Sequence, residues 1–193
     1  IIRDRFEVKP GAIGEKDGLE IMASEAVAFS DMGATFSYDL SGGTIYSYSS
    51  EGRIIDHEKI ISPIPRHCFF EWNYIASPKS TIDGLGVLSV RRALGERLAK
   101  ELKINADFVS YIPESPKDAA EAFSQKVGLP FVETFYKIKA ERSFQGSTQK
   151  ERETSIGKNR FLIPEIANGG FLRQKKGIWS DDSFVRGTVG KRA

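Results

Sequence analysis

The sequence predicts a mixed α/β protein in two parts, a β-rich segment followed by a segment in which helices and strands alternate. Residues 1–62 contain short runs with strand character, separated by glycine-containing turns. Pro63 and Pro65 then resist both a helix and a central strand. Beyond them the apolar spacing changes to steps of three and four, which is typical of helices. We therefore expect domains at 1–62 and 67–193, joined by a linker at 63–66.

Two strands stand out in the first part. Residues 20–23 form a short run with apolar character, and residues 44–48 alternate with the two-residue period of a half-buried strand. Gly42-Gly43 and Glu51-Gly52 provide turn residues before and after the second run. The first part is therefore expected to consist of short strands joined by tight turns.

The second part begins with a long predicted helix over 82–102, with Ser80 or Thr81 as its N-cap. Its apolar residues recur at helical spacing and are expected to form one buried stripe. The members of this stripe are Val87, Val90, Leu94, Leu98 and Leu102.

A strand, a helix and a further strand are expected to follow at 107–112, 117–127 and 131–136. Gly128, with Pro130 just beyond it, marks the end of the helix. The helix face is expected to carry Ala119, Ala122, Phe123 and Val127. Alternation of this kind predicts parallel β-α-β units.

Composition excludes several classes of function. The net charge of +2, without a basic block interleaved with aromatics, gives no reason to expect nucleic acid as a partner. No apolar run approaches the length of a membrane span, and no secretion signal is visible, so no membrane partner is expected. The single cysteine, Cys68, excludes an internal disulfide and favours a cytoplasmic protein. The chain begins without methionine and stops where a helix is expected, so we interpret it as an internal piece of a longer protein.

An acidic pair near the C-terminus is the strongest candidate site. Asp181 and Asp182 follow the short apolar pair Ile178-Trp179 and precede a small loop at 183–188. The carboxylates can accept hydrogen bonds from ribose hydroxyls or hold a hydrated cation, and backbone N–H groups of such a loop can wrap a phosphate. The alternative is a solvated strand-to-helix connection with one aspartate as N-cap.

Residues 140–176 are polar and show weak periodicity. A long polar connection of this kind within a compact domain is often a lid or a binding loop. The alternative is a solvated surface loop.

The loop after the acidic pair carries a specific motif. Asp181-Asp182-Ser183, followed by Val185-Arg186-Gly187-Thr188, resembles the phosphoribosyl pyrophosphate (PRPP) loop of type I phosphoribosyltransferases. The run is most similar to that of the glutamine-dependent amidophosphoribosyltransferases of purine synthesis. Shorter motifs in the same order extend the resemblance over nearly the whole chain: Arg3-Asp4, Lys9-Pro10, Ala23-Ser24-Glu25, Gly42-Gly43-Thr44-Ile45, residues 68–74, Pro78-Lys79-Ser80, Ile82-Asp83-Gly84, Ile112-Pro113-Glu114-Ser115, Arg142-Ser143-Phe144, Thr148-Gln149 and Arg152.

The resemblance implies a fold for each part. Residues 1–62 would be the end of an N-terminal-nucleophile (Ntn) glutaminase β-sandwich, whose nucleophilic cysteine is absent from this sequence. Residues 67–193 would be a type I phosphoribosyltransferase α/β domain with a parallel sheet, truncated after the PRPP loop. Cys68 matches a position that ligates a [4Fe-4S] cluster in some family members and not in others, and both alternatives stay open.

The resemblance also implies an activity and its substrates. Ammonia from glutamine would displace pyrophosphate from PRPP to give phosphoribosylamine. Asp181 and Asp182 would hold the ribose hydroxyls and the water shell of Mg²⁺, with Ser115 as a further metal contact. The loop residues Ser183, Arg186, Gly187 and Thr188 would bind the 5′-phosphate of PRPP. The residues Pro113 and Glu114 would bind the pyrophosphate.

The family's mobile loop would supply positive charge to the leaving group. Lys137, Lys139 and Arg142 are the catalytic candidates in this role. The family's Lys-Asn-Arg-Tyr is replaced here by Lys137-Ile138-Lys139-Ala140, which favours one alternative, a PRPP-binding regulator without catalysis. The other alternative is a base-salvage phosphoribosyltransferase, which the β-rich first part disfavours. A homo-oligomer is expected for the full-length protein.

Overall fold

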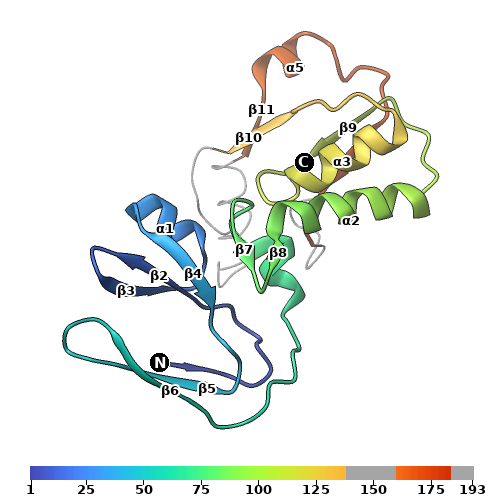
Figure 1. Ribbon diagram of the computed structural model, residues 1–193. Coiled ribbons are helices and arrows are strands. Elements are labelled where there is room, and N and C mark those ends of the chain that lie inside the picture. The colour runs from blue at the N-terminus through green and yellow to red at the C-terminus, as the bar shows by residue number, and fades with distance from the viewer. Residues whose placement is uncertain (138–159, 184–193) are drawn as a thin grey trace, which may run out of the picture. The chain divides into compact units, whose positions relative to one another are not determined.

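The computed structural model describes residues 1–137 and 160–183, in two compact units that divide between Val90 and Arg91 (Figure 1). Residues 62–68 have no regular secondary structure, as expected for a linker. The compact units are not the domains predicted from the sequence, whose boundary at 63–66 stays a prediction.

Two small antiparallel sheets form most of the first unit. One has the order β1-β5-β6 and the other the order β3-β2-β4. The strands are β1 (Ile2–Arg3), β2 (Ala12–Lys16), β3 (Leu19–Ala23), β4 (Thr35–Asp39), β5 (Thr44–Tyr48) and β6 (Ile54–Lys59). Both strands predicted in this part, at 20–23 and 44–48, are confirmed, and Gly43 and Gly52 adopt the positive φ angles of turn glycines.

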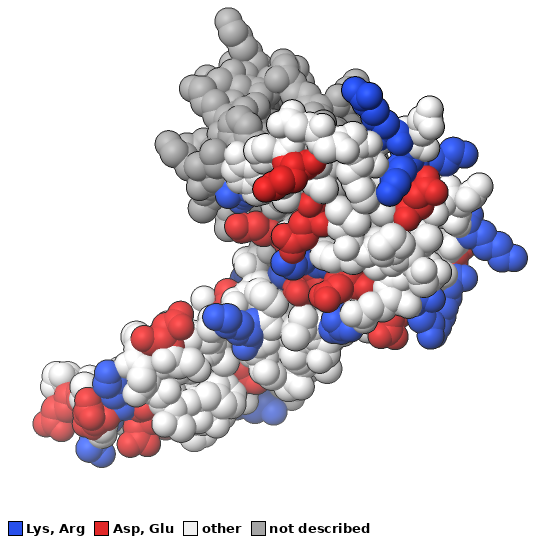
Figure 2. All heavy atoms as spheres, turned by 90° about the horizontal axis from the view of Figure 1, so that it is seen from above, with Lys and Arg blue, Asp and Glu red and all other residues white. Residues whose placement is uncertain are grey.

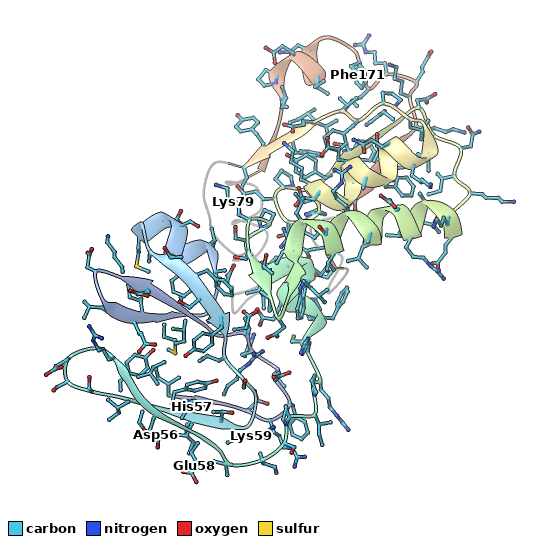
Figure 3. All side chains as sticks on the ribbon, in the orientation of Figure 1. Asp56, His57, Glu58, Lys59, Lys79 and Phe171 are labelled. Atoms are coloured by element: carbon cyan, nitrogen blue, oxygen red, sulfur yellow. The ribbon has the colours of Figure 1, made fainter. Side chains whose placement is uncertain are left out.

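The core of this unit joins the two sheets. One buried cluster consists of Ile13 from β2, Tyr46 from β5, and Leu40. Tyr48 and Ile54 pack against this cluster. β6 is the outer strand of its sheet and carries charged and polar side chains from Asp56 onward, which Figure 3 labels. Charges on an edge strand oppose pairing with another chain. Within β5, Thr44 and Tyr46 are buried and Ser47 is exposed, so the alternation of 44–48 corresponds to one more deeply buried face.

A hairpin replaces the predicted start of the long helix. β7 (Thr81–Ile82) pairs with β8 (Leu85–Gly86), and helix α2 begins only at Val87. Asp83 and Gly84 have φ angles of 49° and 76°, the left-handed conformation that Asp-Gly favours in two-residue hairpin turns. Ser80 does not cap the helix, because its hydroxyl donates to the Glu25 carboxylate at 2.8 Å. The predicted start at residue 82 is therefore wrong.

The predicted apolar stripe of α2 (Val87–Glu101) is only partly correct. Val87 is buried, but Leu98 and Leu102 are 44% and 43% exposed. The buried face continues instead through Arg91 and Gly95. A Cβ atom on Gly95 would overlap the backbone carbonyl of Ala119 in α3, so the absence of a side chain allows the two helices to approach closely.

Helix α3 (Lys117–Val127) matches its prediction in both bounds and ends at Gly128 in the left-handed conformation. Ala122 and Phe123 are buried, whereas Ala119 and Val127 of the predicted face are half-buried. α3 packs on strand β9 (Phe108–Tyr111), whose side chains are all buried. The second core cluster consists of Val109, Tyr111, Ala120 and Phe123, with Ala99, Val127, Leu129, Phe131 and Ile178 packed against it.

Parallel pairing is confirmed in the second unit. β9 pairs in parallel with β12 (Gly177–Ser180), and Phe131 forms an isolated parallel bridge to Val109. The single strand predicted over 131–136 is wrong, because Phe131 is followed by a break. Strand β10 (Phe135–Lys137) then pairs antiparallel with β11 (Arg160–Leu162), which leads into the short helix α5 (Pro164–Asn168). The fold is thus mixed α/β with several small sheets.

Candidate functional site

The carboxyl ends of β9 and β12 lie side by side. Their parallel register pairs Ser180 with Tyr111, and the Ile112 N–H donates to the Ser180 carbonyl at 2.9 Å. Because parallel strands end at the same edge of a sheet, the residues that follow them emerge together. The structure therefore brings the acidic pair at 181–182 close to the loop at 113–115, two segments that sequence analysis assigned to one site.

The acidic pair begins a turn directly after β12. The Asp182 N–H donates to Asp181 Oδ1 at 2.9 Å, and the Ser183 hydroxyl donates to Asp182 Oδ1 at 2.8 Å. Asp181 is exposed, whereas Asp182 and Ser183 are half-buried. These local bonds hold the two carboxylates at the end of the strand, with that of Asp181 at the surface. Such an arrangement suits a polar ligand bound from solvent.

The loop at 113–115 leads directly into α3. Pro113 is buried, Glu114 is exposed and Ser115 is half-buried, and the peptide bond between Pro113 and Glu114 is cis. The Lys117 N–H donates to the Glu114 carbonyl at 3.2 Å, which places the loop at the N-terminus of the helix. The positive end of the helix dipole favours an anion at this position.

A buried arginine, which sequence analysis missed, supports this loop. Arg91 of α2 is 4% exposed, and its Nη1 lies 3.4 Å from the Ser115 carbonyl and 3.7 Å from Asp118 Oδ2. Its side chain thus fixes the end of the loop against the first turn of α3. Arg91 lies one helical step after Val87, on the same face of α2. A pattern that counts only apolar residues does not include arginine.

The remaining predicted site residues are not all described. Lys137 is half-buried at the end of β10. Lys139, Arg142, Arg186, Gly187 and Thr188 lie outside the described residues. The roles of the loop cations and of the second half of the phosphate loop therefore stay predictions.

The residues predicted to hold a magnesium ion carry donor atoms of suitable chemistry. Asp181, Asp182 and Ser115 offer hard oxygen ligands, which Mg²⁺ prefers. Within 1–137 and 160–183, no three His, Cys, Asp or Glu side chains gather closely enough to enclose a metal. An ion held here would complete its coordination with water and substrate oxygens, as Mg²⁺ commonly does.

Cys68 is a free, half-buried thiol that directly precedes the helical segment containing η1 (Glu71–Ile75). It is the single cysteine of the sequence, so the 193 residues do not supply the four thiolates of a [4Fe-4S] cluster. An iron–sulfur site would need cysteines that are not in this sequence, and no step is derived through it.

The surface carries charges of both signs. Figure 2 shows Lys and Arg interspersed with Asp and Glu over the described part of the face in view.

Among the described residues, no helix has the length and apolar character needed to cross a membrane.

Comparison with known proteins identifies related sequences, although no protein-family model matches the chain. The amidophosphoribosyltransferase of Methanothermobacter thermautotrophicus is 35% identical over 192 residues, which cover 99% of this chain and 39% of the relative. The proteins of the same name from Methanocaldococcus jannaschii and Mycobacterium tuberculosis are each 33% identical, over 99% and 97% of the chain. They are covered to 43% and 34% of their own length.

Solved structures agree with these relatives. A glutamine PRPP amidotransferase from B. subtilis, complexed with ADP and GMP, superposes with a TM-score of 0.79 at 31% identity over 98% of this chain. A structure described as the allosteric regulatory enzyme of purine biosynthesis gives a TM-score of 0.80 at 31% identity over 99% of the chain. The chain spans about 40% of each of these structures. In sequence and in fold, the chain therefore corresponds along nearly its whole length to one segment of the amidophosphoribosyltransferases.

Proposed function

We propose that the intact protein is an amidophosphoribosyltransferase. In this reaction, ammonia released from glutamine displaces pyrophosphate from PRPP, giving 5-phosphoribosylamine and glutamate at the start of purine nucleotide synthesis. The relatives that carry this name cover 97–99% of the chain. The observation that carries the proposal is the meeting of Asp181-Asp182 with the loop at 113–115 at one edge of the β9–β12 pair.

Each unit supports one half of the proposed fold. Two antiparallel sheets with a shared core suit the end of a glutaminase β-sandwich, which we assign to 1–62. A parallel strand pair packed against α3 suits a type I phosphoribosyltransferase domain, which we assign to 67–193. We assign 63–66 to the linker between them. Homo-oligomer formation is part of the same proposal.

The two loops would divide the substrate between them. Asp181 and Asp182 would accept hydrogen bonds from the ribose hydroxyls and from the waters of Mg²⁺, with Ser115 as a further metal contact. Magnesium would neutralise part of the pyrophosphate charge. The loop segment Pro113-Glu114, at the N-terminus of α3, would present the Glu114 backbone N–H and the helix dipole to the pyrophosphate, because proline carries no N–H.

The remaining roles fall on residues near the ends of the described segments. Ser183, with Arg186, Gly187 and Thr188, would bind the 5′-phosphate. Lys137, Lys139 and Arg142 would balance the charge that develops on the departing pyrophosphate. Closure of such a loop would also exclude water from a transition state prone to hydrolysis.

Pyrophosphate release by the intact protein tests the proposal. Addition of Mg²⁺, PRPP and glutamine should produce pyrophosphate and glutamate in equal amounts, and ammonia should replace glutamine. A regulator without catalysis would bind PRPP and release no pyrophosphate. A base-salvage enzyme would release it only when a purine or pyrimidine base is added. Either of these two results would overturn the proposal.

A further inference from the structure

Three side chains form a hydrogen-bonded bridge that includes one residue from β9 and one from β12. The Trp179 indole N–H donates to Thr134 Oγ1 at 2.8 Å, and Thr134 Oγ1 lies 2.8 Å from Ser110 Oγ. Ser110 and Thr134 are both fully buried, at 0% exposure. Ser110 and Trp179 are register partners on β9 and β12, and side chains paired in this way project from the same face of a sheet. Thr134 therefore closes a bridge across two paired strands.

Every polar group of Thr134 takes part in a hydrogen bond. Besides the two side-chain contacts, its N–H donates to Ser110 Oγ at 3.3 Å, and its carbonyl accepts from the Ile163 N–H at 2.9 Å. A buried hydroxyl group that loses its hydrogen-bond partner destabilises the folded protein considerably. A residue whose polar groups are all hydrogen-bonded is therefore held firmly in its position. Thr134 is thus fixed to β9, to β12 and to the residue that precedes α5.

Each member of the bridge lies close in sequence to a residue that we propose for the site. Trp179 is separated from Asp181 by one residue, Ser180, and Ser110 is separated from Pro113 by Tyr111 and Ile112. Thr134 directly precedes β10, which ends at Lys137.

We propose that Thr134 is a positioning residue for PRPP binding, because its side chain sets the mutual register of these three segments. The inference rests on the proposed function and deepens it, since it adds a residue that acts through the proposed substrate contacts. The bridge acts on PRPP through the acidic pair and the 113–115 loop. Local sequence patterns do not reveal the bridge, because its three residues are distant in sequence and two of them are ordinary small polar residues.

The test compares two buried hydroxyl groups in the same unit. Thr134→Val keeps the shape of the side chain and removes the bridge, and Thr134→Ser keeps the hydroxyl. Ser124→Ala is the matched control, because the Ser124 hydroxyl is also buried and donates to the Leu129 carbonyl at 2.7 Å, at the end of α3 away from the strand ends. The readouts are the dissociation constant of Mg²⁺-PRPP by calorimetry and the melting temperature of the intact protein.

We expect Thr134→Val to weaken Mg²⁺-PRPP binding about tenfold, the size of effect that follows from leaving buried polar groups unpaired. Thr134→Ser should stay within about twofold of the unaltered protein, since it restores the bridging oxygen. Ser124→Ala should lower the melting temperature without changing PRPP affinity. Equal affinities for Thr134→Val and Ser124→Ala would overturn the inference and leave the proposed function intact.

Two further outcomes keep the test decisive. If Thr134→Val does not fold, Trp179→Phe removes the indole donor and replaces the indole by a smaller ring beside Phe108, whose centroid lies 5.3 Å from that of Trp179. A PRPP affinity unchanged by Trp179→Phe would then overturn the inference. If the unaltered protein binds no PRPP, the proposed function itself fails, which is a different result from a failure of the bridge.

Discussion

Arg3 and Asp83, which are 80 residues apart in sequence, form a two-pronged ion pair in which both N···O distances are 2.7 Å. The Arg3 side chain is buried, and it also donates to the backbone carbonyls of Leu40 and Lys9. Asp83 lies in the turn between β7 and β8, so the pair fastens β1 to that hairpin. The charge-assisted, bidentate geometry is the strong form of such a contact.

Loss of the Arg3 side chain should destabilise the first unit strongly. Arg3→Met leaves the Asp83 carboxylate without its main partner, and removal of one member of a buried pair typically costs about 3–5 kcal/mol. The midpoint of urea unfolding of the intact protein measures the effect. The control is Arg97→Met, because Arg97 pairs with Glu101 on an exposed face of α2 and such pairs contribute below about 1 kcal/mol. Similar losses in both variants would contradict the role given to Arg3.

The same cluster predicts a dependence of stability on pH through Asp39. Burial raises the pKa of Asp39, and the Asp83 carboxylate raises it further, whereas N–H groups of Gly84 and Asp83 act in the opposite direction. A raised pKa means that the folded protein binds this proton more tightly than the unfolded chain does. The stability from this group is therefore complete at low pH and is lost as pH rises through the folded pKa.

Asp39→Asn removes that ionisation and should change the pH profile accordingly. Relative to the unaltered protein, the variant should gain stability as pH rises from about 4, the ordinary aspartate pKa, towards 7. The amide oxygen can still accept hydrogen bonds from the backbone of the hairpin turn. Melting temperatures across this pH range measure the difference. The prediction would be contradicted if the difference in melting temperature between the two proteins stayed constant with pH, or if the variant became relatively less stable at higher pH. Either result would show that burial of Asp39 does not affect its titration.

The contact between α2 and α3 gives a prediction about a single methyl group. Gly95→Ala places a Cβ atom against the Ala119 carbonyl, and overpacking of this kind costs about 1–3 kcal/mol. The better helix propensity of alanine offsets at most about 1 kcal/mol of that cost. Gly86→Ala is the matched control, because the nearest atom to its added Cβ, Ser89 Oγ, would lie at 3.5 Å. A Gly95→Ala variant as stable as Gly86→Ala would disprove the close approach.

The elements that could be predicted from the sequence are those in which local signals agree. Helix α3 has regular apolar spacing and an exit marked by Gly128 and Pro130, so both its bounds could be predicted. The start of α2 could not, because the turn preference of Asp83-Gly84 outweighs the helical spacing around it. The prediction of the buried face of α2 was wrong for a related reason. Arg91 and Gly95 do not count as apolar in a periodicity argument, although both are buried.

The site followed a similar pattern. The resemblance to family motifs assigned the acidic pair and the 113–115 loop to one site, and the structure brings these two segments close together. Their roles in binding stay predictions. The supporting contacts could not be predicted, since Arg91 reaches Ser115 across 24 residues and Trp179 reaches Thr134 across 45. Such contacts depend on the packed arrangement of elements that local sequence patterns do not specify.

Calorimetric titration of the intact protein with PRPP, with and without Mg²⁺, tests the central claim most directly. The variant carries Asp181→Asn together with Asp182→Asn. The control is Asp107→Asn, because Asp107 precedes β9 and accepts a hydrogen bond from the Lys176 N–H at 2.7 Å, at the opposite end of the same strand pair. The account predicts that Mg²⁺-dependent PRPP binding is abolished in the double variant and preserved in the control. Unchanged affinity in the double variant would contradict the assignment of the site to the carboxyl ends of β9 and β12.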